Sequence, residues 1–226
     1  AMMYEMLAQS NWTRPLYISI TVGESNHAGL TPYLIQEGLA SRITPFNTGG
    51  QVIDADRMYD NFMNRFKFGG IDQKGLYLDE TVMRMCYTHR RIFTQLVGQL
   101  IKEGQKDKAL AALDYAEKMI PSYNIPYDWA NGAFQMAESY YQLGQNEKAN
   151  KIIDELANKS LEYMIWYLSL NDNQLAIAGE NFVYNASLLD AEVRLMEKYK
   201  SEELAKHYST QLDQLYNEYV TRMKGK

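Results

Sequence analysis

The sequence predicts a mainly α protein in which antiparallel helix pairs form a solenoid behind a small N-terminal α/β lobe with a short two-stranded ribbon. Two observations lead to this prediction. Up to residue 75 the segments are short and mix strand-like with helical patterns, whereas long amphipathic stretches follow one another afterwards. We therefore expect a junction lobe at 1–75 and a helical repeat region at 76–226.

Composition limits the classes of function. The chain has 226 residues, of which 46% are hydrophobic and 12% are aromatic, so it can bury a sizeable core. Its formal net charge of −5 leaves no excess of cations to replace the counterions of a nucleic acid or an anionic membrane. The longest strongly apolar run, "PLYISITV", is too short to span a bilayer. Neutral or protein partners are therefore expected, with no nucleic acid and no direct membrane insertion.

The N-terminal lobe is expected to contain two strands and two helices. Apolar and polar residues alternate from Leu16 to Val22, which indicates a strand that Pro15 introduces. The segment "SRITPF" is expected to be a second strand at the edge of the sheet, because Pro45 cannot donate to a ladder. The two helices are expected at 32–40 and 55–66.

The first strand is expected to join the lobe to the helical region. We predict that it pairs with the segment around Ile43 and that Trp12 packs beneath the ribbon. Arg14 would then hydrogen-bond to Asp79 or Glu80 at the start of the first long helix. These contacts would set the orientation of the lobe.

Six long amphipathic helices are expected in the repeat region, and two helix pairs share one spacing. Gly104 and Gly144 stand at the turns and Ala109 and Ala149 follow them, so the period is 144 − 104 = 149 − 109 = 40 residues. Glycine permits the tight turn, and alanine lets two helices approach closely. The order of residue types is tetratricopeptide-like, although that repeat has about 34 residues, and the surplus is expected in the loop "SYNIPY". The helices are expected at 79–103, 106–119, 128–143, 146–167, 182–199 and 202–223.

The last two of these helices form a weaker third pair. Ala205 stands where the repeat alanine belongs, whereas Lys200 replaces the turn glycine. We interpret this pair as an atypical end cap, which solenoids require.

The first helix of each pair would line a groove with its outward side chains. Polar side chains there would bind the backbone of an extended segment, and aromatic rings would anchor it. An ordinary solvated face is the alternative, and "HRR" at 89–91 is either an anion-binding cluster or an exposed run of charges. The candidate groove residues are Arg91, Thr94, Asn131, Phe134, Glu138 and Tyr141.

No catalytic, metal or cofactor site is expected. The three histidines, His27, His89 and His207, are far apart, and none pairs with the single cysteine at a metal-ligand spacing. "NTGGQ" and "KFGGID" lack the lysine and hydroxyl residue of a phosphate-binding loop. The cysteine, Cys86, lies in an apolar helical context, which favours a buried structural thiol.

Several segments together resemble one protein family. They are "NWTRPLYISITVG", "GLTPYLIQEGLASRITP", "MYDNFMNRFKFGGID", "LYLDETVMRM", "IKEGQKDKALAALDYAEKMIP" and "YYQLGQNEKANKI". In this order they are similar to the C-terminal soluble region of a bacterial multi-span membrane protein family of unknown function, itself similar to protein O-mannosyltransferases. The resemblance covers Tyr4 to Leu170.

This resemblance implies a membrane-embedded, lipid-sugar-dependent glycosyltransferase ahead of the chain. The catalytic carboxylates would lie near the membrane part and outside this sequence, and this region would lie on the periplasmic face of the inner membrane. The chain also starts inside a helical pattern with no cap before it, as a segment of a longer protein would.

Two hypotheses from different classes follow. The first is a noncatalytic interaction module that positions an acceptor polypeptide, a glycan carrier or a partner subunit. The second is a free-standing helical enzyme domain that acts on glycans with carboxylates such as Asp79 and Glu80. Neighbouring residues diverge by about 100° around a helix, so these two do not form a facing acid and base. The module is therefore the favoured hypothesis.

Overall fold

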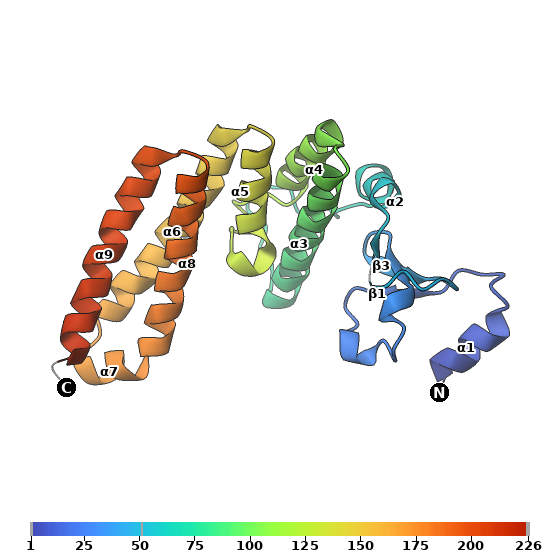
Figure 1. The fold of residues 1–226 in the computed structure, drawn as a ribbon, viewed down its shortest axis with the longest axis horizontal. Helices are drawn as coiled ribbons and strands as arrows, with labels where there is room; N and C mark the ends of the chain where they lie inside the picture. The colour runs from blue at the N-terminus through green and yellow to red at the C-terminus, as the bar shows by residue number, and fades with distance from the viewer. Residues whose placement is uncertain (1, 51, 225–226) are drawn as a thin grey trace. The chain divides into compact units, whose positions relative to one another are not determined.

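A computed structural model describes residues 2–50 and 52–224 (Figure 1). The chain divides into two compact units, Ala1–Asn124 and Ile125–Lys226. It is mainly α, and its small sheet lies in the first unit near the N-terminus, so the predicted fold class is confirmed. No helix within the described ranges is long and apolar enough to cross a membrane.

The sheet has four strands among the residues that the structure describes, whereas two were expected. They lie in the order β1-β3-β2-β4; β3 pairs antiparallel with β1 and β2, and β2 pairs parallel with β4. The predicted pairing of the first strand is confirmed, because Tyr17 faces Arg42 and the Ile43 amide donates to the Leu16 carbonyl at 2.9 Å. The strands are β1 (Tyr17–Ser19), β2 (Leu34–Gln36), β3 (Ala40–Ile43) and β4 (Val52–Ile53).

Two expectations about this sheet are wrong. The segment 32–40 contains no α-helix: it runs from the 3-10 turn η2 (Thr31–Tyr33) through β2 to the turn before β3. In addition, β3 is an inner strand, although Pro45 suggested an edge. The strand ends at Ile43, so no ladder hydrogen bond is required of the proline.

One face of the sheet forms a hydrophobic core. Met3 and Leu7 from the N-terminal helix α1 (Met2–Ser10) pack against it. Trp12 follows this helix in a turn, has a φ of 56° and is 51% exposed, so its expected position beneath the ribbon is wrong. The buried members of the core are Ile18, Leu30, Leu34 and Ile43.

The helices of the first unit confirm the predictions at 55–66, 79–103 and 106–119. Aspartates begin two of them: Asp54 accepts the Arg57 amide at 3.0 Å and Asp79 accepts the Val82 amide at 2.8 Å. The expected boundary after residue 75 lies inside this unit. The helices are α2 (Ala55–Asp60), which continues into the π-helical turn η3 (Asn61–Arg65), then α3 (Glu80–Lys102) and α4 (Lys106–Met119).

The second unit contains the remaining helices. The helix expected at 128–143 is interrupted at Gly132, whose φ of 79° separates the 3-10 turn η4 (Trp129–Asn131) from α5 (Ala133–Gln142). The short helix α7 (Asp172–Ile177) was not expected; Asn171 caps it by accepting the Gln174 amide at 3.0 Å. The long helices are α6 (Asn146–Leu168), α8 (Gly179–Lys198) and α9 (Glu202–Lys224).

The helix pairs α3–α4, α5–α6 and α8–α9 have the same kind of turn. Gly104, Gly144 and Lys200 occupy the left-handed region with φ values of 75°, 74° and 62°. The amide of the next residue donates in each turn to the carbonyl five residues earlier, at 2.8 to 2.9 Å. The repeat alanines Ala109 and Ala149 are fully buried, so the 40-residue spacing describes real packing positions.

Candidate functional site

The first unit contains a cleft of about 330 Å³ between the sheet and α3. Ile18 and the segment after β1 form one wall of the cleft. Gln36 on β2 and Ser41 on β3 line it from the inner strands of the sheet. The opposite wall comes from α3, which contributes Arg91 and Gln95. The cleft therefore combines side chains that lie far apart in the sequence.

Polar groups dominate the interior of this cleft. The buried Gln36 donates to the Gly38 carbonyl at 3.2 Å and reaches Gln95 Oε1 at 3.5 Å. His27 is also buried, with ring nitrogens 3.2 Å from Thr31 Oγ1 and from the Val22 carbonyl. These contacts hold the imidazole in place. The cleft can thus present fixed donors and acceptors to a polar ligand.

Arg91 is the exposed cation of the cleft. It lies on α3, and within the described part of the chain its guanidinium forms no ion pair. A guanidinium offers several donors in a planar fork that fits a carboxylate or two carbonyl oxygens. Of the predicted groove residues in this unit, Arg91 is therefore placed to bind a ligand.

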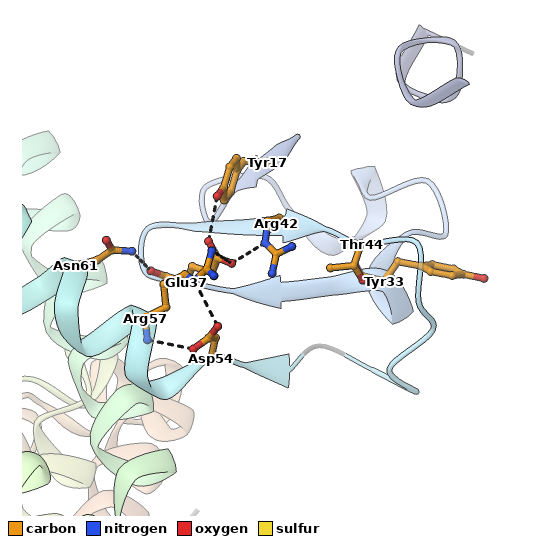
Figure 2. A network of polar contacts seen from close by, with 8 residues as sticks. All are labelled: Tyr17, Tyr33, Glu37, Arg42, Thr44, Asp54, Arg57 and Asn61. Atoms are coloured by element: carbon orange, nitrogen blue, oxygen red, sulfur yellow. Dashed lines mark hydrogen bonds and ion pairs between the residues drawn. The ribbon is translucent and has the colours of Figure 1, made fainter. Parts of the chain in front are cut away.

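A buried carboxylate fixes the strands that form the floor of the cleft (Figure 2). Glu37 is 5% exposed in the turn between β2 and β3. It accepts hydrogen bonds from the Tyr17 hydroxyl at 3.0 Å and from Arg42 Nε at 2.6 Å. Arg57 on α2 lies 3.3 Å from the same carboxylate. We call Glu37 with Tyr17, Arg42 and Arg57 the Glu37 network; it joins β1, β3 and α2 to one turn.

The Glu37 network also raises the pKa values of Tyr17 and Arg42. The hydrogen bond from Arg42 to Glu37 raises the pKa of Arg42. Burial is the main cause that raises the pKa of Tyr17, and the hydrogen bond from Tyr17 to Glu37 raises it further. Asn61 adds a hydrogen bond from its side-chain amide to the Glu37 carbonyl at 2.6 Å. The network keeps its charges paired, so its role is to hold the fold of the lobe.

The expected junction contact is not formed. Asp79 caps α3, and Glu80, with an 86% exposed side chain, lies 3.9 Å from Arg84 on the same helix. Arg14 is exposed and forms no ion pair with either carboxylate in the described ranges. A different contact holds the segment before α3 in place. The Asn124 side chain donates to the carbonyls of Ile71 and Gln73 at 2.8 and 2.6 Å.

The "HRR" segment is neither an exposed charge run nor one cluster. Arg90 is fully buried and donates from Nη2 to the Ile120 carbonyl at 2.8 Å. His89 is half-buried, and burial lowers its pKa. Thr94, the second groove candidate on α3, is 7% exposed and donates to the Arg91 carbonyl at 2.7 Å. Only Arg91 of this segment is exposed.

Two groove candidates in the second unit are buried packing residues. Asn131 is fully buried and donates to the Pro126 carbonyl at 2.8 Å. Tyr141 is 4% exposed, donates to Asn150 Oδ1 at 2.5 Å and stacks on Tyr199 with ring centres 4.7 Å apart. A ligand cannot reach either side chain without disturbing the packing.

The other two candidates in this unit have partners but remain partly exposed. Phe134 stacks on Trp129 with ring centres 4.2 Å apart. Glu138 forms an ion pair with Lys198 at 2.8 Å. The four candidates of the second unit therefore serve its internal contacts.

Sequence reasoning missed a buried carboxyl group in the second unit. Glu192 on α8 is fully buried; its Oε1 accepts a hydrogen bond from Trp129 Nε1 at 2.6 Å and lies 3.3 Å from Ser160 Oγ. Burial is the main cause that raises the pKa of Glu192 to about 7, although both hydrogen bonds oppose it. The sequence does hold a signal, because Glu192 falls on the apolar stripe with Leu189, Val193 and Met196.

Glu37 was missed for a different reason. The sequence pattern predicts a helix over this segment, whereas "EGLA" forms the turn between β2 and β3. Gly38 in that turn has a φ of 141°, a conformation that favours glycine.

Metal binding finds no support in the described side chains. No group of three or more His, Cys, Asp or Glu residues among them could hold an ion. Cys86 is buried, as expected, and burial raises the pKa of its thiol. A raised pKa keeps the thiol protonated, so Cys86 is a poor nucleophile.

Comparison with family models gives a match to the N-terminal part of the chain. Residues 1–62 match the family model described as TMEM260-associated domain 2. This segment contains the four strands and the Glu37 network, and it ties the N-terminal part of the chain to a family named for a membrane protein. Neither the curated proteins nor the solved structures include a match to the chain.

Proposed function

We propose that this chain is a noncatalytic interaction module of a larger membrane-associated protein. In this role it holds a polypeptide, a glycan carrier or a partner subunit in position for the membrane part. The observation that carries the proposal is the exposed guanidinium of Arg91 in the cleft between the sheet and α3, which forms no ion pair with any residue that the structure describes. A fixed cleft that contains a guanidinium without an ion pair among the described residues suits the binding of an oxygen-rich group.

Two lines of support connect this module to a membrane protein, and the second of them also suggests a glycosyltransferase. The family model that matches residues 1–62 is named for association with a transmembrane protein. The sequence segments from Tyr4 to Leu170 resemble the soluble region of a family similar to protein O-mannosyltransferases. Under this proposal the parent protein transfers a lipid-linked sugar, the helix pairs are tetratricopeptide-like, and the module lies on the periplasmic face of the inner membrane.

A glycan-active enzyme is the alternative, and Glu192 is the observation that favours it. A carboxyl group with a pKa of about 7 can serve as a general acid at neutral pH. However, Glu192 is fully buried, and a general acid must come within hydrogen-bond reach of its substrate. Asp79 and Glu80, the carboxylates first considered, are a helix cap and a solvent-exposed side chain. The interaction module is therefore the better supported function.

Site-specific photocrosslinking in the full-length parent tests this proposal. A benzophenone amino acid in place of Gln95 puts the reactive group in the cleft wall, and mass spectrometry of host membranes identifies the crosslinked segment. We expect one defined segment, and we expect Arg91→Ala to reduce its yield about tenfold through loss of a charge-assisted contact.

Arg84→Ala is the matched control, because Arg84 lies on the same helix with a 70% exposed side chain and outside the cleft. Both variants should keep the melting temperature, since neither guanidinium is buried. Equal crosslinking in the parent and in Arg91→Ala would contradict a binding role for the cleft. The coding sequence ahead of Ala1 gives a separate check: the proposal expects about ten apolar segments of spanning length there.

A further inference from the structure

The second unit contains a small pocket that the proposed function does not use. Its volume is about 130 Å³, and it lies where η4, α6 and α8 meet. The residues that decide its chemistry are Asp128, Lys159, Ser160, Tyr163, Tyr184 and Asn185.

Charges of both signs stand at this pocket. Lys159 forms an ion pair with Asp128, and their side chains are 37% and 28% exposed. A cationic ligand would approach the Lys159 ammonium, and an anionic ligand would approach Asp128. A neutral ligand avoids both penalties and can still hydrogen-bond to the carboxylate, the ammonium and the nearby Asn185 amide.

Two tyrosines supply apolar surface beside these polar groups. Tyr163 is 46% exposed and Tyr184 is 58% exposed, so their rings are available to a ligand. Each ring has an apolar body and a hydroxyl at its tip. The pocket therefore fits a ligand with an apolar face and hydroxyl groups around its edge.

Glu192 contacts two side chains of the pocket lining. Trp129 and Ser160, the two side chains beside its Oε1, both line the pocket. Its other oxygen, Oε2, is buried and has no hydrogen-bond partner among the described residues. Buried oxygens without a partner are rare in native proteins and call for a donor such as a water or a ligand.

We propose that this pocket binds one neutral polyhydroxylated ring, either a sugar or a cyclitol. The mixed charges select against ions, the tyrosines contact the apolar face of the ring, and its hydroxyls bond to Asp128, Lys159 and Asn185. The pocket is separate from the Arg91 cleft, so either proposal can fail without the other.

Titration of the whole chain with small probes tests this inference. The Trp129 indole resonance, assigned with Trp129→Phe, reports on the pocket in an NMR titration. Methyl glucoside and methyl mannoside test the sugar, myo-inositol tests the cyclitol, and propylammonium and acetate test the charge selection. We expect a saturable shift with a sugar or with inositol at millimolar affinity, on the order of what so small a contact allows.

Tyr184→Ala should weaken this binding about fivefold or more, because it removes the most exposed ring. Tyr216→Ala is the matched control: Tyr216 is 42% exposed on α9 of the same unit and does not line the pocket. The inference is overturned if no neutral ring gives a saturable shift with a dissociation constant below about 50 mM. Binding weaker than this would have no functional role. Tighter binding of propylammonium or acetate, or equal weakening by both tyrosine variants, would also overturn it.

Discussion

The indole nitrogen of Trp129 donates a hydrogen bond of 2.6 Å to the buried carboxyl group of Glu192. This contact joins η4 to the middle of α8 across 63 residues of sequence. It satisfies only one of the two carboxyl oxygens, because Oε2 has no partner among the described residues. The ionised carboxylate is therefore poorly solvated in the fold, which explains why burial raises the pKa of Glu192 to about 7.

Glu192 should make the second unit less stable as the pH rises. The pKa is about 7 in the fold against 4.5 for an ordinary glutamate, so between these values the folded state holds a proton that the unfolded state releases. Stability is thus highest below pH 4.5 for this group and falls until about pH 7. The shift corresponds to about 3 kcal/mol in the free energy of unfolding.

Urea unfolding at several pH values between 5 and 8 measures this effect, with the pH window set by the raised pKa. Glu192→Gln keeps an oxygen acceptor for Trp129 but cannot ionise, so the unfolding midpoint of the variant should fall less over this range. Equal pH dependence of the two proteins would show that Glu192 does not carry the effect. The comparison is needed because other carboxylates titrate at the acidic end of the range.

Tyr141 should behave as a core residue and not as a ligand contact. Tyr141→Phe removes the hydroxyl that bonds to Asn150, which should cost about 1 to 2 kcal/mol of stability. Tyr141→Ala also removes the ring that stacks on Tyr199 and should cost about 3 to 5 kcal/mol. Thermal unfolding checks both values, and Tyr184→Phe at an exposed position should change stability little. If Tyr141→Ala left the stability unchanged, the groove hypothesis would be restored for this residue.

The long helices could be predicted because their signals are local. Apolar residues recur along each long helix, glycine marks the turns of the first two pairs, and alanine marks the close approaches, so the segment itself contains the pattern. The ends of α3 and α4 were predicted to within one residue for this reason. Even the weaker third pair was found, because Ala205 keeps its place in the spacing.

The sheet and the sites could not be predicted to the same degree. Strands of two to four residues are too short to show a period, and β2 pairs with β4 through contacts that the local sequence does not specify. The position of Glu192 on the apolar stripe of α8 indicates its burial. Its contact with Trp129 depends on the tertiary fold and could not be predicted. The Arg14 contact failed because an exposed ion pair gains little over solvation by water.

Glu37 should contribute strongly to the stability of the first unit. Glu37→Leu leaves the Arg42 guanidinium and the Tyr17 hydroxyl without their acceptor, so we expect a loss of about 2 to 4 kcal/mol. Arg65→Ala is a useful comparison, because it breaks an ion pair with Asp60 whose side chains are 70% and 41% exposed. That loss should stay below about 1 kcal/mol. Similar unfolding free energies for the two variants would contradict the proposed role of the Glu37 network.

Lys200 should be a site where glycine stabilises the protein. It has a φ of 62°, in the region that Gly104 and Gly144 occupy in the two preceding turns. A residue with a side chain is strained there by about 1 kcal/mol or more, although glycine makes the unfolded chain more flexible. Lys200→Gly should therefore raise the free energy of unfolding by about 0.5 to 1 kcal/mol.

The reciprocal variant, Gly144→Ala, isolates the effect of the backbone conformation on stability. A side chain at Gly144 would meet no atom within 4 Å, so Gly144→Ala introduces left-handed strain without a clash. We expect it to lower the unfolding free energy by about 1 kcal/mol, opposite in sign to Lys200→Gly. Chemical unfolding of both variants at one pH measures the pair. Changes of the same sign would mean that contacts of the Lys200 side chain, and not the conformation of the turn, decide the stability of the α8–α9 pair.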